Sequence, residues 1–244
     1  MAFFLPKSRL KKTKKNMNKI LVIVAHPDDE VLGCGCTISK YSQNSEVFVL
    51  ILGEGITSRY DSREKVDPRA VQNLKNKSIE AGRILGVRET MFLDLPDQRF
   101  DVLPFLEIVK RVEEIINRIK PDIIYTHSQS DLNLDHRICF NAVLTASRPK
   151  PEMFIKEIIS FEIPSSTEWS FGKINGYFCP NVFESGEQKD IEKKLNALRI
   201  YESEMRQFPH PRSEEAILSL GKTRGSCVGV NYAEAFELIR RTNN

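Results

Sequence analysis

The hexapeptide Ala25-His-Pro-Asp-Asp-Glu30 holds one imidazole and three carboxylates, all groups that can bind a metal ion or transfer a proton. It directly follows an apolar run, residues 19–25, that is rich in β-branched side chains. Acidic side chains avoid burial unless they are paired, so packing does not explain them at the end of a core strand. An acidic turn that caps the next helix is the alternative. Imidazole with carboxylate suits Zn²⁺, which takes three protein ligands in a catalytic site and leaves one position for water.

A second cluster, Asp131-Leu-Asn-Leu-Asp-His136, follows another apolar run at residues 122–126. Its spacing is similar to that of a calcium loop, but the glycine and the distal glutamate of such a loop are missing. A single histidine at the start of a helix is more often structural than functional. However, two such clusters after parallel strands meet at one edge of the sheet, where ligands bind in open α/β folds. Together they predict a metal site.

The apolar patterning predicts the strands and helices that must position these clusters. Buried strands are predicted at 19–25, 46–52, 90–93, 122–126 and 157–163. Helices are predicted between them at 31–43, 69–85, 102–119 and 136–147. This alternation predicts an α/β fold with a mostly parallel sheet and helices on both faces. After Pro164 the pattern weakens, and helices are predicted at 187–207, 213–220 and 232–241.

The chain length of 244 residues suits one large α/β domain, and 41% hydrophobic with 28% charged residues is an ordinary globular balance. The net charge of +3 is unevenly placed, because seven lysines and arginines fall within the first 19 residues. The rest of the chain is slightly acidic and gives no reason to expect nucleic acid as a partner. We therefore expect a flexible basic tail at 1–17 and a globular domain at 18–244. A weak anchor to anionic lipid is the alternative for the tail.

Five cysteines do not make an even set, so we expect reduced thiols and a cytoplasmic protein. No apolar run approaches the roughly 20 residues of a membrane-spanning helix, so no transmembrane segment is expected. The N-terminus places its apolar residues before its basic ones, the reverse of a signal peptide.

The two clusters together resemble the motifs of the PIG-L/LmbE family of zinc-dependent de-N-acetylases. Weaker matches extend the resemblance over about residues 19–240, at Gly33-Cys-Gly-Cys-Thr37, Leu85-Gly-Val87, Leu95-Pro-Asp97, Lys194 to Glu204, and Tyr232-Ala-Glu-Ala-Phe236. The resemblance implies a single Rossmann-like domain that removes the N-acetyl group from an N-acetylglucosamine-type sugar. The substrate would be a small amino sugar, free or linked to a nucleotide or lipid. The sequence leaves the oligomeric state open, a homo-oligomer included.

Carried over by position, the resemblance makes His26, Asp29 and His136 the Zn²⁺ ligands and Asp28 the general base. Zinc lowers the pKa of its bound water to about 7, so a carboxylate can complete its deprotonation. The resulting hydroxide would attack the acetamide carbonyl, and the protonated Asp28 would then supply a proton to the leaving amine.

The sequence departs from the family pattern in two places. Many relatives carry a histidine where this chain has Asn133, whose amide can donate a hydrogen bond to an oxyanion but cannot exchange a proton. Either Asp28 carries out all proton transfer, or His127 or His210 substitutes. Relatives also tend to carry an arginine where this chain has Leu74, with only Arg69, Lys75 and Lys77 nearby.

Four further residues are candidates for substrate binding. Arg59 and Arg63, in the loop after the second strand, could meet a phosphate or diphosphate, although solvated loop charge is the alternative. By resemblance, Asp97 would hydrogen-bond sugar hydroxyls, although a simple turn residue is the alternative. His127 follows the strand at 122–126 and so faces the same edge of the sheet.

Three other classes of function compete with a deacetylase. Asn133 motivates a catalytically weak, sugar-binding pseudoenzyme. A metal-dependent hydrolase of another bond, such as a phosphoester, would favour an all-oxygen Mg²⁺ or Mn²⁺ site, which two histidines argue against. A dinucleotide-binding protein would need glycines and no acidic cluster after the first strand.

Overall fold

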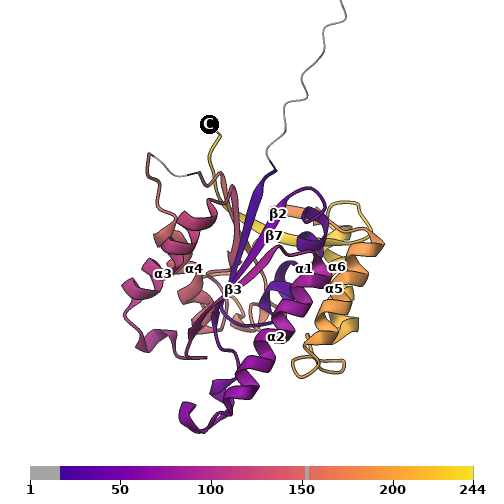
Figure 1. Cartoon of the computed structure of the whole chain (residues 1–244). Coiled ribbons are helices and arrows are strands. Elements are labelled where there is room, and N and C mark those ends of the chain that lie inside the picture. Colours follow the sequence, from indigo (N-terminus) through magenta and orange to yellow (C-terminus); the bar gives the residue numbers. More distant parts are fainter. Residues whose placement is uncertain (1–16, 152–153, 244) are drawn as a thin grey trace, which may run out of the picture.

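The computed structural model describes residues 17–151 and 154–243. Apolar runs with many β-branched residues form the central strands of its seven-stranded sheet (Figure 1). In β1 (Lys19–Val24), successive side chains point to opposite faces of the sheet. Ile20 and Val22 pack into the hydrophobic cluster on one face, and Leu21 and Ile23 pack into the cluster on the other. The strand is therefore buried on both sides, as a central parallel strand must be.

The strand order in the sheet is β3-β2-β1-β4-β5-β7-β6. Besides β1, the strands are β2 (Glu46–Gly53), β3 (Glu89–Leu95), β4 (Ile123–His127), β5 (Glu157–Phe161), β6 (Val182–Ser185) and β7 (Ala233–Arg241). The first five strands in this order are parallel, and β7 runs antiparallel to both of its neighbours. The predicted α/β fold with a mostly parallel sheet is therefore confirmed.

Helices cover both faces of the sheet, as Figure 1 shows. One face packs against α1 (Asp29–Tyr41), α2 (Pro68–Leu85), α5 (Gln188–Ile200) and α6 (Glu214–Ser226). The other face packs against α3 (Phe105–Ile119) and α4 (Leu134–Ala146). In the part of the chain that the structure describes, four short 3-10 turns lie in the connections, namely η1 (Thr57–Arg59), η2 (Arg63–Lys65), η3 (Phe100–Val102) and η4 (Glu168–Ser170).

The C-terminal third differs from the sequence prediction. Residues 232–241, predicted as a helix, form strand β7, which pairs with β5 on one side and β6 on the other. Its first half, Ala233–Phe236, is buried, and a segment this short has no clear periodicity that separates a strand from a helix. The helix predicted at 187–207 ends at Ile200, and the one predicted at 213–220 continues to Ser226.

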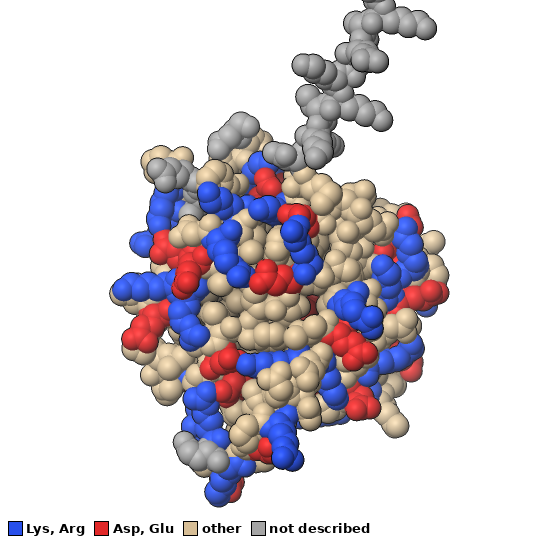
Figure 2. All heavy atoms as spheres, viewed as in Figure 1, with Lys and Arg blue, Asp and Glu red and all other residues tan. Residues whose placement is uncertain are grey.

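Basic and acidic side chains are interspersed over the face of the molecule seen in Figure 2. Apart from Met17, the predicted basic tail at 1–17 lies outside the described residues. Within the described residues, no helix is long and apolar enough to cross a membrane. The thiols of all five cysteines are free, as the sequence analysis expects.

The direction of strand addition reverses between β1 and β4. The chain runs from β1 outward through β2 to β3, and then returns to place β4 and β5 on the other side of β1. The carboxyl ends of β1 and β4 therefore lie next to each other at a topological switch point, the place where open α/β sheets bind their ligands. Both predicted clusters follow these two strands.

A buried ion pair joins the C-terminal strand to the first helix. Helix α1 is bent at Cys34, whose backbone is not helical. At the bend, the Glu234 carboxylate of β7 accepts hydrogen bonds from the backbone N–H groups of Cys36 (3.0 Å) and Thr37 (2.8 Å). The Lys194 ammonium of α5 lies 2.6 Å from the same carboxylate. Glu234 therefore caps the second half of α1 and neutralises a buried lysine.

Replacing Glu234 by alanine should lower the free energy of unfolding by about 3–5 kcal/mol, because it leaves the Lys194 charge buried and uncompensated. Urea denaturation measures this change. Glu89→Ala is the matched control, since Glu89 pairs with Arg118 at the surface and such pairs contribute about 0–1 kcal/mol. Equal losses in the two variants would contradict a special role for the buried pair.

Candidate metal centre

A left-handed turn at Asp28 connects strand β1 to helix α1. Asp28 has φ of 102°, a conformation that is uncommon for a residue with a side chain, and Asp29 then begins the helix. The carboxylate of Glu30 accepts the Asp28 N–H at 3.1 Å, and the Tyr201 hydroxyl donates to Glu30 at 2.6 Å. This buried network stabilises the left-handed backbone of Asp28. That backbone separates the side chain of Asp28 from that of Asp29.

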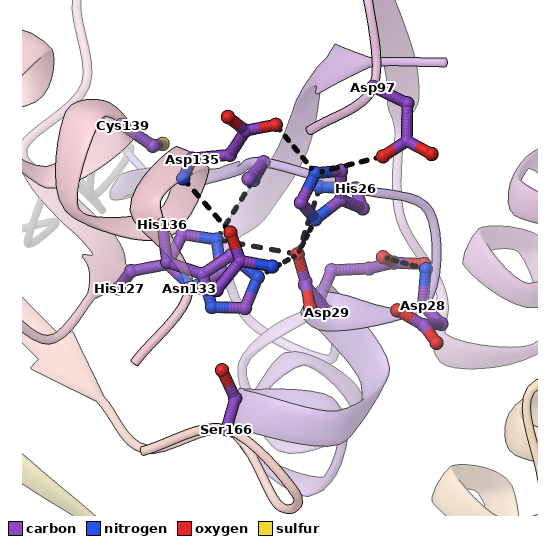
Figure 3. A network of polar contacts seen from close by, with 12 residues as sticks. His26, Asp28, Asp29, Asp97, His127, Asn133, Asp135, His136, Cys139 and Ser166 are labelled. Carbon is purple, nitrogen blue, oxygen red and sulfur yellow. Dashed lines mark hydrogen bonds and ion pairs between the residues drawn. The ribbon is translucent and has the colours of Figure 1, made fainter. Parts of the chain in front are cut away.

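Three of the predicted residues meet at one point. His26, Asp29 and His136 each offer one ligand atom, and these atoms lie within 4.8 Å of one another. Oδ2 of Asp29 is 3.5 Å from Nδ1 of His26 and 3.3 Å from Nε2 of His136 (Figure 3). His26 forms a second such group with Asp97 and Asp135. The structure thus has a group that can hold a metal ion, whereas the role of each residue as a ligand stays a prediction.

Carboxylates lie beside the outer ring nitrogens of both histidines. Nδ1 of His136 is 3.1 Å from Asp131, which accepts hydrogen bonds from Ser166 and, at 2.6 Å, from Thr167. Nε2 of His26 is 3.1 Å from Asp135. Metal-binding histidines almost always have such a partner on the nitrogen that faces away from the ion, because it fixes the ring and increases its basicity. The surroundings therefore fit a metal centre.

The pKa values show that the centre attracts positive charge. Burial alone would lower the pKa of His136, but Asp29 and Asp131 outweigh it and raise that pKa to about 9. Burial likewise opposes Asp135 and Asp29 at His26, whose pKa nevertheless lies well above its ordinary value. The raised pKa values mean that both imidazoles tend to hold protons. A metal ion bound there would displace them.

The carboxylate of Asp28 lies apart from this group and has a different environment (Figure 3). Burial raises its pKa to about 7, although the Arg212 guanidinium, 2.8 Å away, favours the charged form. A carboxyl group that titrates near neutral pH can both accept and return a proton in one reaction cycle.

A polar cavity of about 170 Å³ opens over the centre and is lined by His26, Asp28, Asp29 and His136, among others. Asp97 also lines it, but its carboxylate already accepts hydrogen bonds from the Ser58 backbone at 3.1 Å and hydroxyl at 2.6 Å. Asp97 therefore holds the loop after β2 against His26, in addition to facing the cavity.

The other predicted residues differ in how close they come to the cavity. Arg59 and Asn133 line it, and the Asn133 side chain also caps α4 by accepting the Asp135 N–H at 2.9 Å. Arg63 pairs with Glu54 and is not among the lining residues.

His127 does not line the cavity. Its ring stacks on that of His136 with 4.0 Å between centroids, and it is fully buried behind that residue. Burial lowers its pKa to about 3, so its neutral Nε2 accepts the Ala25 N–H at 2.8 Å. The position of His127 fits a support for the neighbouring His136 better than a substrate contact.

The sequence analysis missed Arg212 and Glu204, which both line the cavity. Arg212 lies 184 residues from its partner Asp28, between a proline and the N-cap residue of α6, so no local pattern marks it. Leu74, at the position of the family arginine, is buried in the core, and neighbouring Lys75 pairs with Asp94. The cationic side chains of the cavity therefore come from other elements.

A comparison with protein families identifies the class. Residues 21–147 match the PIG-L family, described as GlcNAc-PI de-N-acetylase, and the chain belongs to this family. The membership predicted from the two clusters is confirmed.

Two relatives match over most of the chain. The uncharacterized deacetylase YaiS of Escherichia coli (strain K12) is 30% identical over 189 residues, 75% of this chain and 90% of that protein. The diacetylchitobiose deacetylase of Thermococcus kodakarensis is 26% identical over 236 residues, 92% and 84% of the two chains. Because the relatives are deacetylases, the predicted enzyme class, a hydrolase of amides, is confirmed.

Solved structures show the same fold. The N,N'-diacetylchitobiose deacetylase of Pyrococcus horikoshii superposes with a TM-score of 0.72 at 22% identity, covering 92% of this chain and 85% of that one. The 4-carboxy-2-hydroxymuconate hydratase GalB of Pseudomonas putida superposes with a TM-score of 0.70 at 21% identity, covering 93% and 99%. Because a hydratase shares it, the fold alone does not determine the reaction.

The purified protein should bind one divalent metal ion per chain, and His136→Ala should remove most of it, because two ligands rarely retain an ion that three hold. Metal analysis of dialysed protein measures the occupancy. His210→Ala is the control, since His210 packs against Trp169 and belongs to neither metal-binding group. Full occupancy in His136→Ala would exclude this ligand set.

Metal affinity should increase as the pH rises towards 9. The raised pKa values of His26 and His136 mean that the metal-free centre retains protons well above neutral pH. Each proton that binding displaces should strengthen affinity by about tenfold per pH unit. Competition titrations with a metallochromic chelator at pH 6.5, 7.5 and 8.5 measure this slope. A flat profile would contradict ligation through these two imidazoles.

Proposed function

We propose that this chain is a zinc-dependent hydrolase that removes the acetyl group from an N-acetylglucosamine-type amino sugar. One observation carries the proposal. At the switch point of the sheet, His26, Asp29 and His136 can hold one ion, and the Asp28 carboxylate lines the same cavity. Family membership indicates amide hydrolysis, and this arrangement supplies groups for it.

The donor set favours zinc. Two imidazoles and one carboxylate with an open fourth position are typical of catalytic Zn²⁺ sites, whereas Mg²⁺ and Ca²⁺ prefer oxygen ligands. A zinc ion held there would act as a Lewis acid towards water and the acetamide carbonyl. The carboxylates of Asp131 and Asp135 would orient the two histidines from behind.

Asp28 would move the protons. With a pKa near 7, its carboxylate takes a proton from the attacking water and returns it to the leaving amine. Arg212 orients this carboxylate through a 2.8 Å contact. The Asn133 oxygen is engaged in the helix cap, so its amide N–H groups are the ones left to donate to the oxyanion.

The amino-sugar substrate is proposed from the relatives. The Thermococcus kodakarensis protein, which matches 92% of this chain, is a diacetylchitobiose deacetylase. A largely polar cavity with several hydrogen-bonding side chains fits a hydroxyl-rich ligand of this kind.

Mass spectrometry after incubation of the zinc-loaded protein with a panel of N-acetylated sugars tests this function. The panel includes N-acetylglucosamine, diacetylchitobiose and nucleotide-linked and lipid-linked N-acetylglucosamine. We expect the loss of one acetyl group from at least one of them, and no loss after the metal is removed. Zinc-loaded protein that deacetylates none of the panel would overturn the proposal in favour of a binding protein or another reaction.

Asp28→Asn should keep the metal but lower kcat by about 10²–10⁴-fold with little change in KM, because it removes only the proton acceptor. Turnover and metal content are measured on the same sample. Asn133→His in the Asp28→Asn background should restore part of the activity, since it adds a group that titrates near neutral pH.

Asp101→Asn, an exposed aspartate on η3, is the matched control and should behave as wild type. Loss of the metal in Asp28→Asn would make Asp28 a ligand. Near-normal turnover with the metal retained would assign the base to another residue.

A further inference from the structure

Four charged side chains from separate parts of the chain form one network in the cavity wall. Both carboxylate oxygens of Glu204 lie 2.6 Å from Nη2 of Arg59. Nη1 of Arg212 lies 3.9 Å from Glu204 and 2.8 Å from Asp28. All four residues line the cavity. We call Arg59, Glu204, Arg212 and Asp28 the wall network.

Burial distinguishes three of the four residues of this network from ordinary surface ion pairs, whereas the side chain of Arg59 is 44% exposed. The side chains of Asp28, Glu204 and Arg212 are 5%, 12% and 21% exposed, so water screens their charges only in part. Nε of Arg212 also donates to the Ser165 hydroxyl at 2.8 Å, which fixes the plane of the guanidinium. Glu204 thus holds Arg59 and neutralises a guanidinium that would otherwise attract anions.

The remaining titratable groups of the cavity are two further carboxylates and the imidazoles of His26 and His136, which would be neutral when they hold a metal ion. Asp29 and Asp97 line it as well, so four carboxylates face two guanidinium groups, and one divalent ion would bring this set to neutrality. A phosphate or carboxylate on the substrate would have to displace Glu204 from Arg59. It would then lie beside the displaced carboxylate, and like charges placed together at an interface are unfavourable.

We propose that this cavity selects amino sugars that carry no anionic group over phosphorylated or carboxylated ones, and that Glu204 is the residue that sets this preference. The inference rests on the proposed function and narrows its substrate class. It also changes the expectation for Arg59, which the sequence alone suggested as a phosphate contact. Hydroxyl groups can share hydrogen bonds with the wall network without breaking its ion pairs.

Direct binding tests the preference without relying on turnover. Glucosamine, glucosamine 6-phosphate and glucosamine 1-phosphate are titrated into the zinc-loaded protein by calorimetry. Wild-type protein should bind glucosamine at least about tenfold more tightly than either phosphate. Glu204→Gln should reduce the ratio of the glucosamine affinity to the sugar-phosphate affinity by about tenfold or more, because it removes a negative charge and releases Arg59. Any direct contact between phosphate and zinc is common to both proteins and cancels in the comparison.

Two further variants keep the test decisive. Glu202→Gln is the matched control, because Glu202 is exposed, pairs with Lys77 and does not line the cavity. The affinity ratio of this variant should equal that of wild type. Arg59→Gln should widen the ratio, which tests the same network should Glu204→Gln fail to fold.

Two results would overturn the inference and leave the proposed function intact. In the first, wild-type protein binds a sugar phosphate as tightly as glucosamine. In the second, neither Glu204→Gln nor Arg59→Gln changes the ratio of the two affinities. Binding of none of the three sugars would instead count against the amino-sugar function itself.

Discussion

The carboxylate of Asp29 is the group around which the candidate centre is organised. Its Oδ2 accepts a hydrogen bond from the backbone N–H of His26 at 2.9 Å. The same oxygen lies within 3.5 Å of the imidazoles of His26, His127 and His136. These residues come from the ends of β1 and β4 and the start of α4. A buried carboxylate surrounded by three rings requires a cation, because an uncompensated charge in that position is costly. The switch point of the sheet is what brings the three segments together.

The sequence predicts the parallel part of the sheet well because β1, β2, β4 and β5 carry apolar runs long enough to be read locally. It does not predict β7. The run from Ala233 to Phe236 is short and contains the charged Glu234, and only its pairing between β5 and β6 makes it a strand. Tertiary context decides such segments, and no window of the sequence contains that information.

The same division applies to the site. That His26, Asp29 and His136 come together was predictable, because the two motifs that contain them follow the recognisable core strands β1 and β4. Arg212 and Glu204 were not, because they lie in the irregular segment between α5 and α6 and acquire their role only by facing Asp28 and Arg59. For His127, the position in the sequence indicated the correct edge of the sheet. It could not reveal that the ring of His127 lies behind that of His136.

The insertion of β7 between β5 and β6 has a consequence for how the protein is made. On a ribosome, the parallel strands emerge first, but the sheet remains open at β5 until strand β7 (Ala233–Arg241) leaves the exit tunnel. The Glu234 carboxylate that caps the bent helix α1 arrives with it. Helix α1 begins at Asp29, so the candidate metal centre obtains its final support from β7. Such non-local closure is slow, and it makes synthesis through β7 a condition for a finished centre.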